Sequence, residues 1–254
     1  MNFTELKISS KILEGIQKVG YDEMTDIQAG IIPLALEKKD VIGQAPTGTG
    51  KTCAFVVPSL QELDSTSGDI QTLVMCPTRE LALQITDEFK KIGQFMPGLR
   101  VLTIYGGQDI KKQLKGLKEH PQIVVGTPGR LLDHIERRSI NLTKVRSIVL
   151  DEADEMLDMG FIRDINRILD KTNKTHQTLL LSATMEREIL EISRKYQKDP
   201  SFFKATIADK DIPKIEQFYI KANERQKVAV IKRLIKDKNF YLVLIFTNTR
   251  HKAK

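Results

Sequence analysis

Residues 45–52 (APTGTGKT) combine glycines and hydroxyl side chains with a lysine, between two apolar runs. Gly48 and Gly50 allow the backbone to curl with its N–H groups pointing inward. Lys51 supplies a positive charge for terminal phosphates, and the Thr52 hydroxyl can hold a magnesium ion. We therefore predict a phosphate-binding loop where a strand gives way to a helix, with Ala45 where the strict pattern has glycine. A glycine- and threonine-rich turn with an unrelated lysine is the alternative.

An acidic tetrad (DEAD, residues 151–154) directly follows the apolar run 147–150. Magnesium prefers oxygen ligands, and a carboxylate at the end of a buried strand can hold it near a phosphate loop. We predict that Asp151 holds the metal shell and that Glu152 orients or deprotonates an attacking water. A solvated helix N-terminus, where the dipole favours acidic residues, is the alternative. The upstream phosphate loop favours the metal site.

The chain is basic, with a net charge of +7 and a sequence pI near 9.2 over 254 residues. This balance favours a polyanionic partner, although a basic protein without one has the same composition. Cys53 and Cys76 both lie in apolar runs, which excludes a disulfide framework and indicates a reducing compartment. Neither a signal peptide nor a membrane span is visible, so we expect a cytoplasmic protein that does not contact membranes.

Short apolar runs alternate with helical patterns along most of the chain. The runs predict buried strands at 41–45, 72–76, 101–105, 123–125, 147–150 and 178–181. Helices are predicted at 8–19, 25–36, 79–95, 109–117, 129–136, 155–169 and 186–195, with Pro33 as a kink or break. This alternation predicts an α/β fold whose mostly parallel sheet is covered by helices on both faces. Ligands of such folds bind at the carboxyl edge of the sheet.

The last part of the chain predicts a linker at 207–213 and an incomplete second α/β domain at 214–254. A strand at 215–220, a helix at 224–236 and a strand at 241–246 are expected there. Two strands and one helix cannot bury an independent core of useful size. We therefore interpret residues 214–254 as the truncated start of a domain.

The phosphate loop and the DEAD tetrad, followed by Ser182-Ala183-Thr184 after the next strand, resemble the DEAD-box RNA helicases. The resemblance extends over almost the whole chain. It implies a RecA-like P-loop NTPase domain over 1–206 that binds ATP, Mg²⁺ and RNA, followed by the start of a second RecA-like domain. The segment 244–250 resembles motif IV, the first motif of that second domain.

The stretch 20–28 is similar to the family's Q motif, which implies that Tyr21 packs on adenine and that the Gln28 amide reads it. Phe3 matches the upstream aromatic, and Met24 stands where the family usually has proline. The resemblance assigns ATP binding to Phe3, Tyr21, Gln28, Ala45, Thr47, Gly48, Thr49, Gly50, Lys51 and Thr52. Lys51, Asp151 and Glu152 are the expected catalytic residues.

Three further segments resemble the RNA-binding motifs Ia, GG and Ib of the family. Their residues are Pro77, Thr78, Arg79 and Glu80; Gly106 and Gly107; and Thr127, Pro128, Gly129 and Arg130. Backbone N–H groups, hydroxyls and arginines in such loops can bind successive phosphates of single-stranded RNA. Contact mainly with the sugar–phosphate backbone gives little sequence specificity. Taken singly, each segment could be an ordinary turn.

The resemblance also implies that Asp154, Ser182, Ala183 and Thr184 couple the ATP state to RNA binding. The hydroxyls could instead cap the following helix. We expect the complete enzyme to couple ATP hydrolysis to local opening of RNA duplexes, and this chain alone to be a weak ATPase without unwinding. A non-enzymatic fragment that binds RNA or a partner, and a DNA translocase, are the alternatives.

Overall fold

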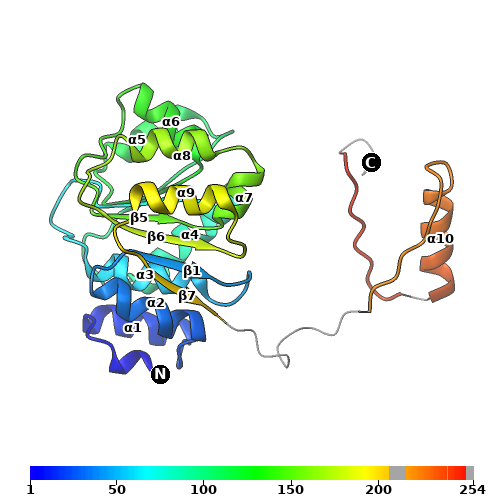
Figure 1. Ribbon diagram of the computed structural model, residues 1–254, viewed down its shortest axis with the longest axis horizontal. Coiled ribbons are helices and arrows are strands. Elements are labelled where there is room, and N and C mark those ends of the chain that lie inside the picture. The colour runs from blue at the N-terminus through cyan, green and yellow to red at the C-terminus, as the bar shows by residue number, and fades with distance from the viewer. Residues whose placement is uncertain (206–215, 239, 250–254) are drawn as a thin grey trace. The chain divides into compact units, whose positions relative to one another are not determined.

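The computed structural model describes residues 1–205, 216–238 and 240–249, and the chain divides into two compact units, Met1–Thr206 and Ile207–Lys254 (Figure 1). The linker predicted at 207–213 lies outside the described residues, as do Ile215 and Arg250. All the candidate ATP, metal, RNA and coupling residues belong to the described part of the first unit.

The first unit contains a seven-stranded sheet with the strand order β3-β4-β2-β5-β6-β1-β7. Its strands are β1 (Val41–Gln44), β2 (Thr72–Met75), β3 (Val101–Ile104), β4 (Ile123–Gly126), β5 (Ser147–Leu150), β6 (Gln177–Ser182) and β7 (Ser201–Lys204). Every neighbouring pair is parallel, which confirms the predicted α/β class. The sequence analysis did not predict β7. This edge strand alternates half-buried and exposed side chains, so it lacks the continuous apolar run of a central strand.

Two α-helices precede β1, and the others connect the strands. They are α1 (Ser10–Val19), α2 (Asp26–Leu36), α3 (Lys51–Gln61), α4 (Arg79–Ile92), α5 (Ile110–Leu117), α6 (Pro128–Glu136), α7 (Ala153–Asp158), α8 (Ile162–Leu169) and α9 (Arg187–Tyr196). The single helix predicted at 155–169 is in fact two, because Gly160 adopts a left-handed conformation with φ of 79°. The break expected at Pro33 is absent, and α2 continues through it to Leu36.

The core lies on both faces of the sheet, because successive strand residues point to opposite sides. Val74 of β2 packs with apolar residues of α1 to α4, whereas its neighbour Leu73 packs with residues of α6 to α9. Accordingly, α1, α2 and α3 lie on one side of the sheet, and α6, α8 and α9 lie on the other (Figure 1). Burial on both faces explains the nearly continuous Val, Ile and Leu content of the central strands.

The strand register brings the carboxyl ends of the central strands to one edge. Gln44 pairs with Ser182, and Leu150 pairs with both Met75 and Leu180. The residues that follow these strands therefore begin at a common level. This alignment places the phosphate loop, the DEAD tetrad and the predicted RNA-binding loops along the same edge.

In the described part of the second unit, α10 (Lys227–Lys238) is the only regular element. The strands predicted at 215–220 and 241–246 were wrong, because residues 216–220 and 241–246 form no strand. A strand requires a partner for its backbone N–H and C=O groups, and an apolar run alone does not provide one. Apolar side chains such as Tyr241, Leu244 and Phe246 are exposed in this unit.

Candidate functional site

The phosphate loop follows β1, and its backbone depends on its glycines. Gly48 and Gly50 have φ values of 81° and 90°, and Gly50 is the N-cap of α3. A Cβ atom on Gly50 would lie 2.5 Å from Nε2 of Gln28, so the site excludes a side chain there. Ala45 is 1% exposed and donates its N–H to the Ser182 carbonyl at 3.0 Å. Alanine therefore fits the first position of the loop.

The Lys51 side chain lies within the loop. It is 6% exposed, and its Nζ donates to the carbonyls of Ala45 at 2.7 Å and Pro46 at 2.8 Å. Burial lowers the pKa of Lys51, although the nearby Asp151 and Glu152 carboxylates act in the opposite direction. The ammonium group is thus held at the mouth of the loop, where a phosphate could replace the carbonyls as its acceptor.

Two side chains at the start of α2 donate hydrogen bonds to backbone carbonyls of the phosphate loop. Thr25 Oγ1 donates to the Thr49 carbonyl at 2.8 Å, and Gln28 Nε2 donates to the Gly50 carbonyl at 3.1 Å. The other end of the Gln28 amide accepts from the Thr25 N–H at 2.9 Å and completes a capping box. Gln28 therefore supports the loop directly, and its predicted contact with adenine stays a prediction.

A cavity of about 440 Å³ opens beside the loop. Its lining combines predicted residues with several from α4: Tyr21, Thr47, Gly48, Gly50, Lys51, Thr52, Cys53, Leu81, Gln84, Glu88, Asp151 and Glu152. The Tyr21 hydroxyl donates to Glu88 Oε1 at 2.9 Å, and burial, followed by this bond, raises the Tyr21 pKa. Phe3 does not line this cavity, because it is 1% exposed and packed in the core.

The DEAD tetrad begins where β5 ends, and its first two carboxylates line the same cavity as the loop. Asp151 is 2% exposed, and burial raises its pKa to about 7 against the opposing charge of Lys51. Burial also raises the pKa of Glu152, whose backbone has a left-handed φ of 54°. That conformation turns the chain sharply between β5 and α7.

The donor set fits a magnesium ion. Thr52 supplies a hydroxyl and Asp151 a buried carboxylate, both facing one cavity that also contains the phosphate loop. Magnesium is commonly held by one or two carboxylates together with substrate phosphates, so it needs no complete protein cage. The described residues contain no group of three or more His, Cys, Asp or Glu side chains arranged to hold a metal by themselves.

Asp154 connects the tetrad to the segment that follows β6. Its Oδ2 accepts from the N–H groups of Ala183 at 3.0 Å and Thr184 at 2.8 Å, and the Asp154 N–H donates to Ser182 Oγ at 3.2 Å. Burial alone would raise the pKa of Asp154, but the hydrogen bonds from Thr184 and Ser182 outweigh it and lower this pKa. The hydroxyls of Ser182 and Thr184 bond to Asp154, at 3.2 Å each, and not to the first turn of α9, so they do not cap that helix.

The predicted RNA-binding loops leave β2, β3 and β4, which are neighbours in the sheet. Thr78 caps α4 by accepting the Leu81 N–H at 3.2 Å, and the Arg79 guanidinium lies 4.9 Å from the centre of the Tyr105 ring. Gly107 has a φ of 86° and lies in open space. The sheet therefore brings all three segments side by side, next to the cavity beside the phosphate loop that α4 also lines.

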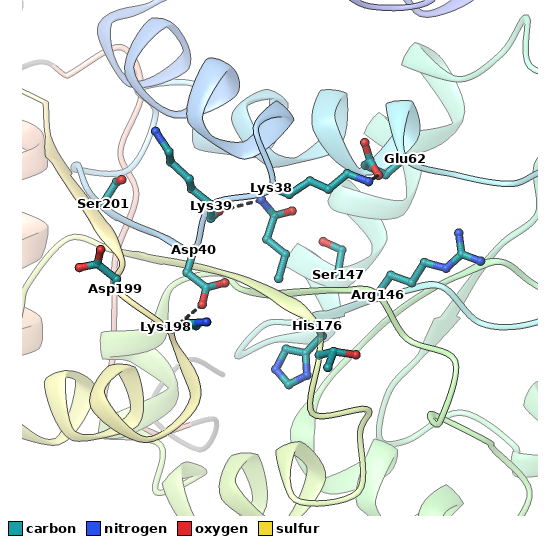
Figure 2. Close-up of a pocket in the computed structure, with 12 residues that line it drawn as sticks. Lys38, Lys39, Asp40, Glu62, Arg146, Ser147, His176, Lys198, Asp199 and Ser201 are labelled. Carbon is teal, nitrogen blue, oxygen red and sulfur yellow. Dashed lines mark hydrogen bonds and ion pairs between the residues drawn. The ribbon is translucent and has the colours of Figure 1, made fainter.

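A larger cavity, of about 710 Å³, lies at the amino ends of the strands and contains none of the predicted site residues (Figure 2). Two of its charged groups, Asp40 and Lys38, make contacts that connect separate segments of the first unit. Asp40 accepts the N–H groups of Thr178 and Lys198, both at 2.6 Å, and Lys38 pairs with Glu62 at 2.8 Å. We therefore assign the functional site to the carboxyl edge.

The sequence analysis missed several residues of the site. Glu88 and Gln84 lie on the partly exposed side of α4, where a surface helix normally carries polar residues. Gln113 and His134, by contrast, are buried between α5 and α6. In the sequence, their burial was indicated only by their helical spacing from apolar residues. Glutamine is mostly exposed and histidine is often partly exposed, so this spacing did not single them out.

A parallel α/β sheet with a phosphate loop, an acidic strand end and adjoining loops at one edge defines a RecA-like nucleotide-binding domain. The DEAD/DEAH box helicase family model matches residues 25–192. The chain therefore belongs to the DEAD/DEAH box helicase family.

Among curated relatives, the chain is 47% identical to the DEAD-box ATP-dependent RNA helicase CshA of Bacillus cereus, over 99% of this chain and 48% of that protein. It is 46% identical to CshA of Bacillus subtilis, over 100% of this chain and 51% of that protein. The chain thus spans about half the length of these relatives.

Solved structures also resemble the chain, among them the following two. The first is a DEAD box protein from the hyperthermophile Methanococcus jannaschii, with a TM-score of 0.79 and 45% identity over 95% of this chain and 65% of that one. The second is a hypothetical ATP-dependent RNA helicase from Sulfolobus tokodaii, with a TM-score of 0.72 and 37% identity over 78% and 57% of the two chains. Among the described residues, no helix has the length and apolar character needed to span a membrane.

Proposed function

We propose that this chain binds Mg–ATP and the sugar–phosphate backbone of single-stranded RNA, as the first half of an ATP-dependent RNA helicase. The observation that carries the proposal is the single cavity that Lys51, Thr52, Asp151 and Glu152 line together. These four side chains offer a phosphate-binding cation, two metal-binding oxygens and a carboxylate positioned for proton transfer.

Each residue has a distinct role in the proposed hydrolysis. Lys51 and the loop N–H groups bind the terminal phosphates, while Thr52 and Asp151 hold Mg²⁺. When bound, the metal neutralises charge that develops on the phosphate oxygens. Glu152 lines the same cavity and orients or deprotonates the attacking water.

RNA binding is proposed for the loops after β2, β3 and β4. They present hydroxyls, backbone N–H groups and the Arg79 guanidinium, which suit phosphates better than base edges. The ring of Tyr105 is covered by Arg79 at 4.9 Å, so it is not free to stack on a base. We therefore expect little sequence specificity and a strong dependence of affinity on salt.

Asp154 is the proposed coupling residue, because it joins the DEAD tetrad to Ala183 and Thr184. Duplex opening is proposed only for the longer protein, since the chain spans about half of its curated relatives. An arginine supplied to the transferring phosphate contributes about 10³- to 10⁵-fold in rate. If that arginine belongs to the other half, this chain alone hydrolyses ATP slowly and does not unwind RNA.

A non-enzymatic RNA- or partner-binding fragment is the second candidate, and the exposed Tyr241, Leu244 and Phe246 of the second unit favour it. Equal RNA affinity with and without ATP would support this candidate. The cytoplasmic location stays a prediction based on cysteine use.

Equilibrium binding of a fluorescent ATP analogue tests the proposal, with Lys51→Ala compared with Lys38→Ala. Lys38 is a matched control because it pairs with Glu62 beside the opposite cavity. Losing the charge-assisted phosphate contact should weaken binding by Lys51→Ala at least about tenfold, and Lys38→Ala should bind like the unmodified chain. Unchanged binding by Lys51→Ala would contradict the proposed site.

A further inference from the structure

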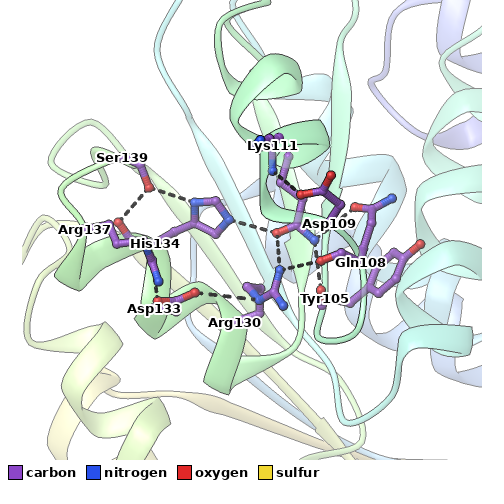
Figure 3. Close-up of polar contacts among 10 residues, drawn as sticks. Tyr105, Gln108, Asp109, Lys111, Arg130, Asp133, His134, Arg137 and Ser139 are labelled. Atoms are coloured by element: carbon purple, nitrogen blue, oxygen red, sulfur yellow. Dashed lines mark hydrogen bonds and ion pairs between the residues drawn. The ribbon is translucent and has the colours of Figure 1, made fainter.

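A buried polar network joins α5 and α6 behind the predicted RNA-binding loops. Gln113 of α5 is 1% exposed, and His134 of α6 is fully buried at 0%. Figure 3 shows Arg130 and His134 extending from α6 toward the loop that carries Tyr105 and Gln108. Buried polar groups are costly unless every donor and acceptor is satisfied, so this arrangement requires an explanation.

The Gln113 amide is the centre of the network. Its Nε2 donates to the Tyr105 carbonyl at 2.9 Å and to Gln108 Oε1 at 3.0 Å. Its Oε1 accepts from Arg130 Nη1 at 3.2 Å and faces His134 Nε2 at 2.9 Å. All four hydrogen-bonding positions of the amide are therefore used, and they join the loop after β3 to the helix that follows β4.

Arg130 and the Tyr105 carbonyl fix the orientation of this amide, and the amide in turn sets the tautomer of His134. Because Gln113 Oε1 can only accept, His134 Nε2 must carry the proton. The Ser139 hydroxyl then donates its one proton to two acceptors, His134 Nδ1 at 2.8 Å and the His134 carbonyl at 3.0 Å. Burial lowers the pKa of His134, which is consistent with a neutral ring. Flipping the amide would place its NH₂ group against the Arg130 donor and its oxygen against the Tyr105 carbonyl, so only one orientation satisfies the network.

The Gly106-Gly107 turn depends on this amide for its position. Neither glycine has an atom within 4 Å of the place a Cβ would occupy, so packing around the turn is sparse. Gln113 instead contacts Tyr105 just before the turn and Gln108 just after it. Gln108 and Gln113 both accept from Arg130 Nη1, whose bond to the Gln108 carbonyl is 3.0 Å long.

We propose that Gln113 is a positioning residue for RNA binding, which holds the Gly106-Gly107 turn and Arg130 at a fixed spacing suited to neighbouring phosphates of one strand. The inference rests on the proposed RNA-binding function. Gln113 itself is too deeply buried to contact RNA, so it acts through the groups it orients. Side chains held by such a second layer of hydrogen bonds lose less freedom when they bind.

The test compares Gln113→Ala with Gln122→Ala in the full 254-residue chain. Gln122 is a matched control because it is 0% exposed and directly precedes β4, at the amino ends of the strands. Its amide donates to the carbonyls of Ser65 and Gly98. Binding of a short fluorescein-labelled oligouridylate is measured at several salt concentrations. Circular dichroism and the thermal midpoint verify that each variant folds.

Gln113→Ala should bind the RNA about tenfold more weakly than the unmodified chain, with a smaller salt slope, because phosphate contacts are lost. Gln122→Ala should bind RNA normally even where its thermal midpoint falls. Equal RNA affinity for Gln113→Ala and the unmodified chain, or equal losses in both variants, would overturn the inference. Failure of the unmodified chain to bind RNA would overturn the proposed function as well.

If Gln113→Ala does not fold, His134→Ala and His134→Gln decide the question. His134→Gln keeps an N–H donor that can reach the Gln113 oxygen, whereas His134→Ala removes it. RNA affinity should fall in His134→Ala and recover in His134→Gln. Equal affinity in these two variants would contradict a positioning role for the amide.

Discussion

At the residue scale, Tyr21 is held by a hydrogen bond as well as by packing. Its hydroxyl donates to Glu88 on α4 at 2.9 Å, and both side chains line the cavity beside the phosphate loop. The bond holds the ring at the place where the sequence predicts an adenine contact. A side chain held in place before binding loses less entropy when it binds.

Removing the hydroxyl tests this role. Tyr21→Phe keeps the ring but loses the bond, and we expect its affinity for ATP to fall about two- to tenfold, the net effect of one ordinary hydrogen bond. Glu88→Gln keeps an acceptor oxygen and should bind ATP more tightly than Glu88→Ala. The measurement is a titration with fluorescent ATP, and identical affinities in all these variants would contradict the role.

At the residue scale, several residues that line the candidate cavity could be predicted, because binding a phosphate and a metal requires particular side chains at a fixed spacing. Lys51, Thr52, Asp151 and Glu152 were all expected from the sequence, and they line one cavity. The buried amide of Gln113 could not be predicted, since its neighbours Lys111 and Lys112 suggest a solvated helix face. Its role depends on contacts with Tyr105 and Arg130, which are distant in sequence.

At the element scale, the contact between α5 and α6 should respond to pH. Burial lowers the pKa of His134, so the unfolded chain binds a proton at that residue more readily than the folded chain. Neutral His134 therefore contributes fully to the free energy of unfolding above the unfolded pKa of histidine, about 6.5. This contribution is lost as the pH falls below that value.

The midpoint of urea unfolding, measured at neutral and mildly acidic pH, tests this expectation. The unmodified chain should lose stability on acidification, and His134→Gln should lose less because it cannot take up a proton. His120→Gln is the control, since His120 is exposed. The expectation fails if His134→Gln and the unmodified chain show the same pH dependence.

Element prediction succeeded where burial produces a repeating pattern. Strands β1 to β6 are nearly continuous apolar runs, and helices such as α4 carry a clear apolar stripe. The edge strand β7 has one poorly covered face, and its Phe202 is 55% exposed, so it left no such signal. The opposite error arose at 241–246, where an apolar run exists but forms no strand.

At the scale of the whole molecule, the first unit contains both hydrophobic clusters. All of their residues lie between Phe3 and Ala205, whereas α10 in the second unit buries none of its side chains. A chain ending at Thr206 should therefore fold by itself and retain the ATP affinity of the full chain. Its thermal midpoint should lie within a few degrees of the full chain, as expected when little buried area is lost. A shortened chain that fails to fold would contradict this division.

We propose that one cavity of the first unit binds Mg–ATP and that Glu152 activates the attacking water there. The most direct test is phosphate release from a limiting amount of ATP by an excess of this chain, compared with Glu152→Gln. We expect slow release by the unmodified chain, and in Glu152→Gln unchanged ATP affinity with release reduced about 10²- to 10⁴-fold, the usual contribution of a general base. Release by Glu152→Gln at the rate of the unmodified chain would contradict the account.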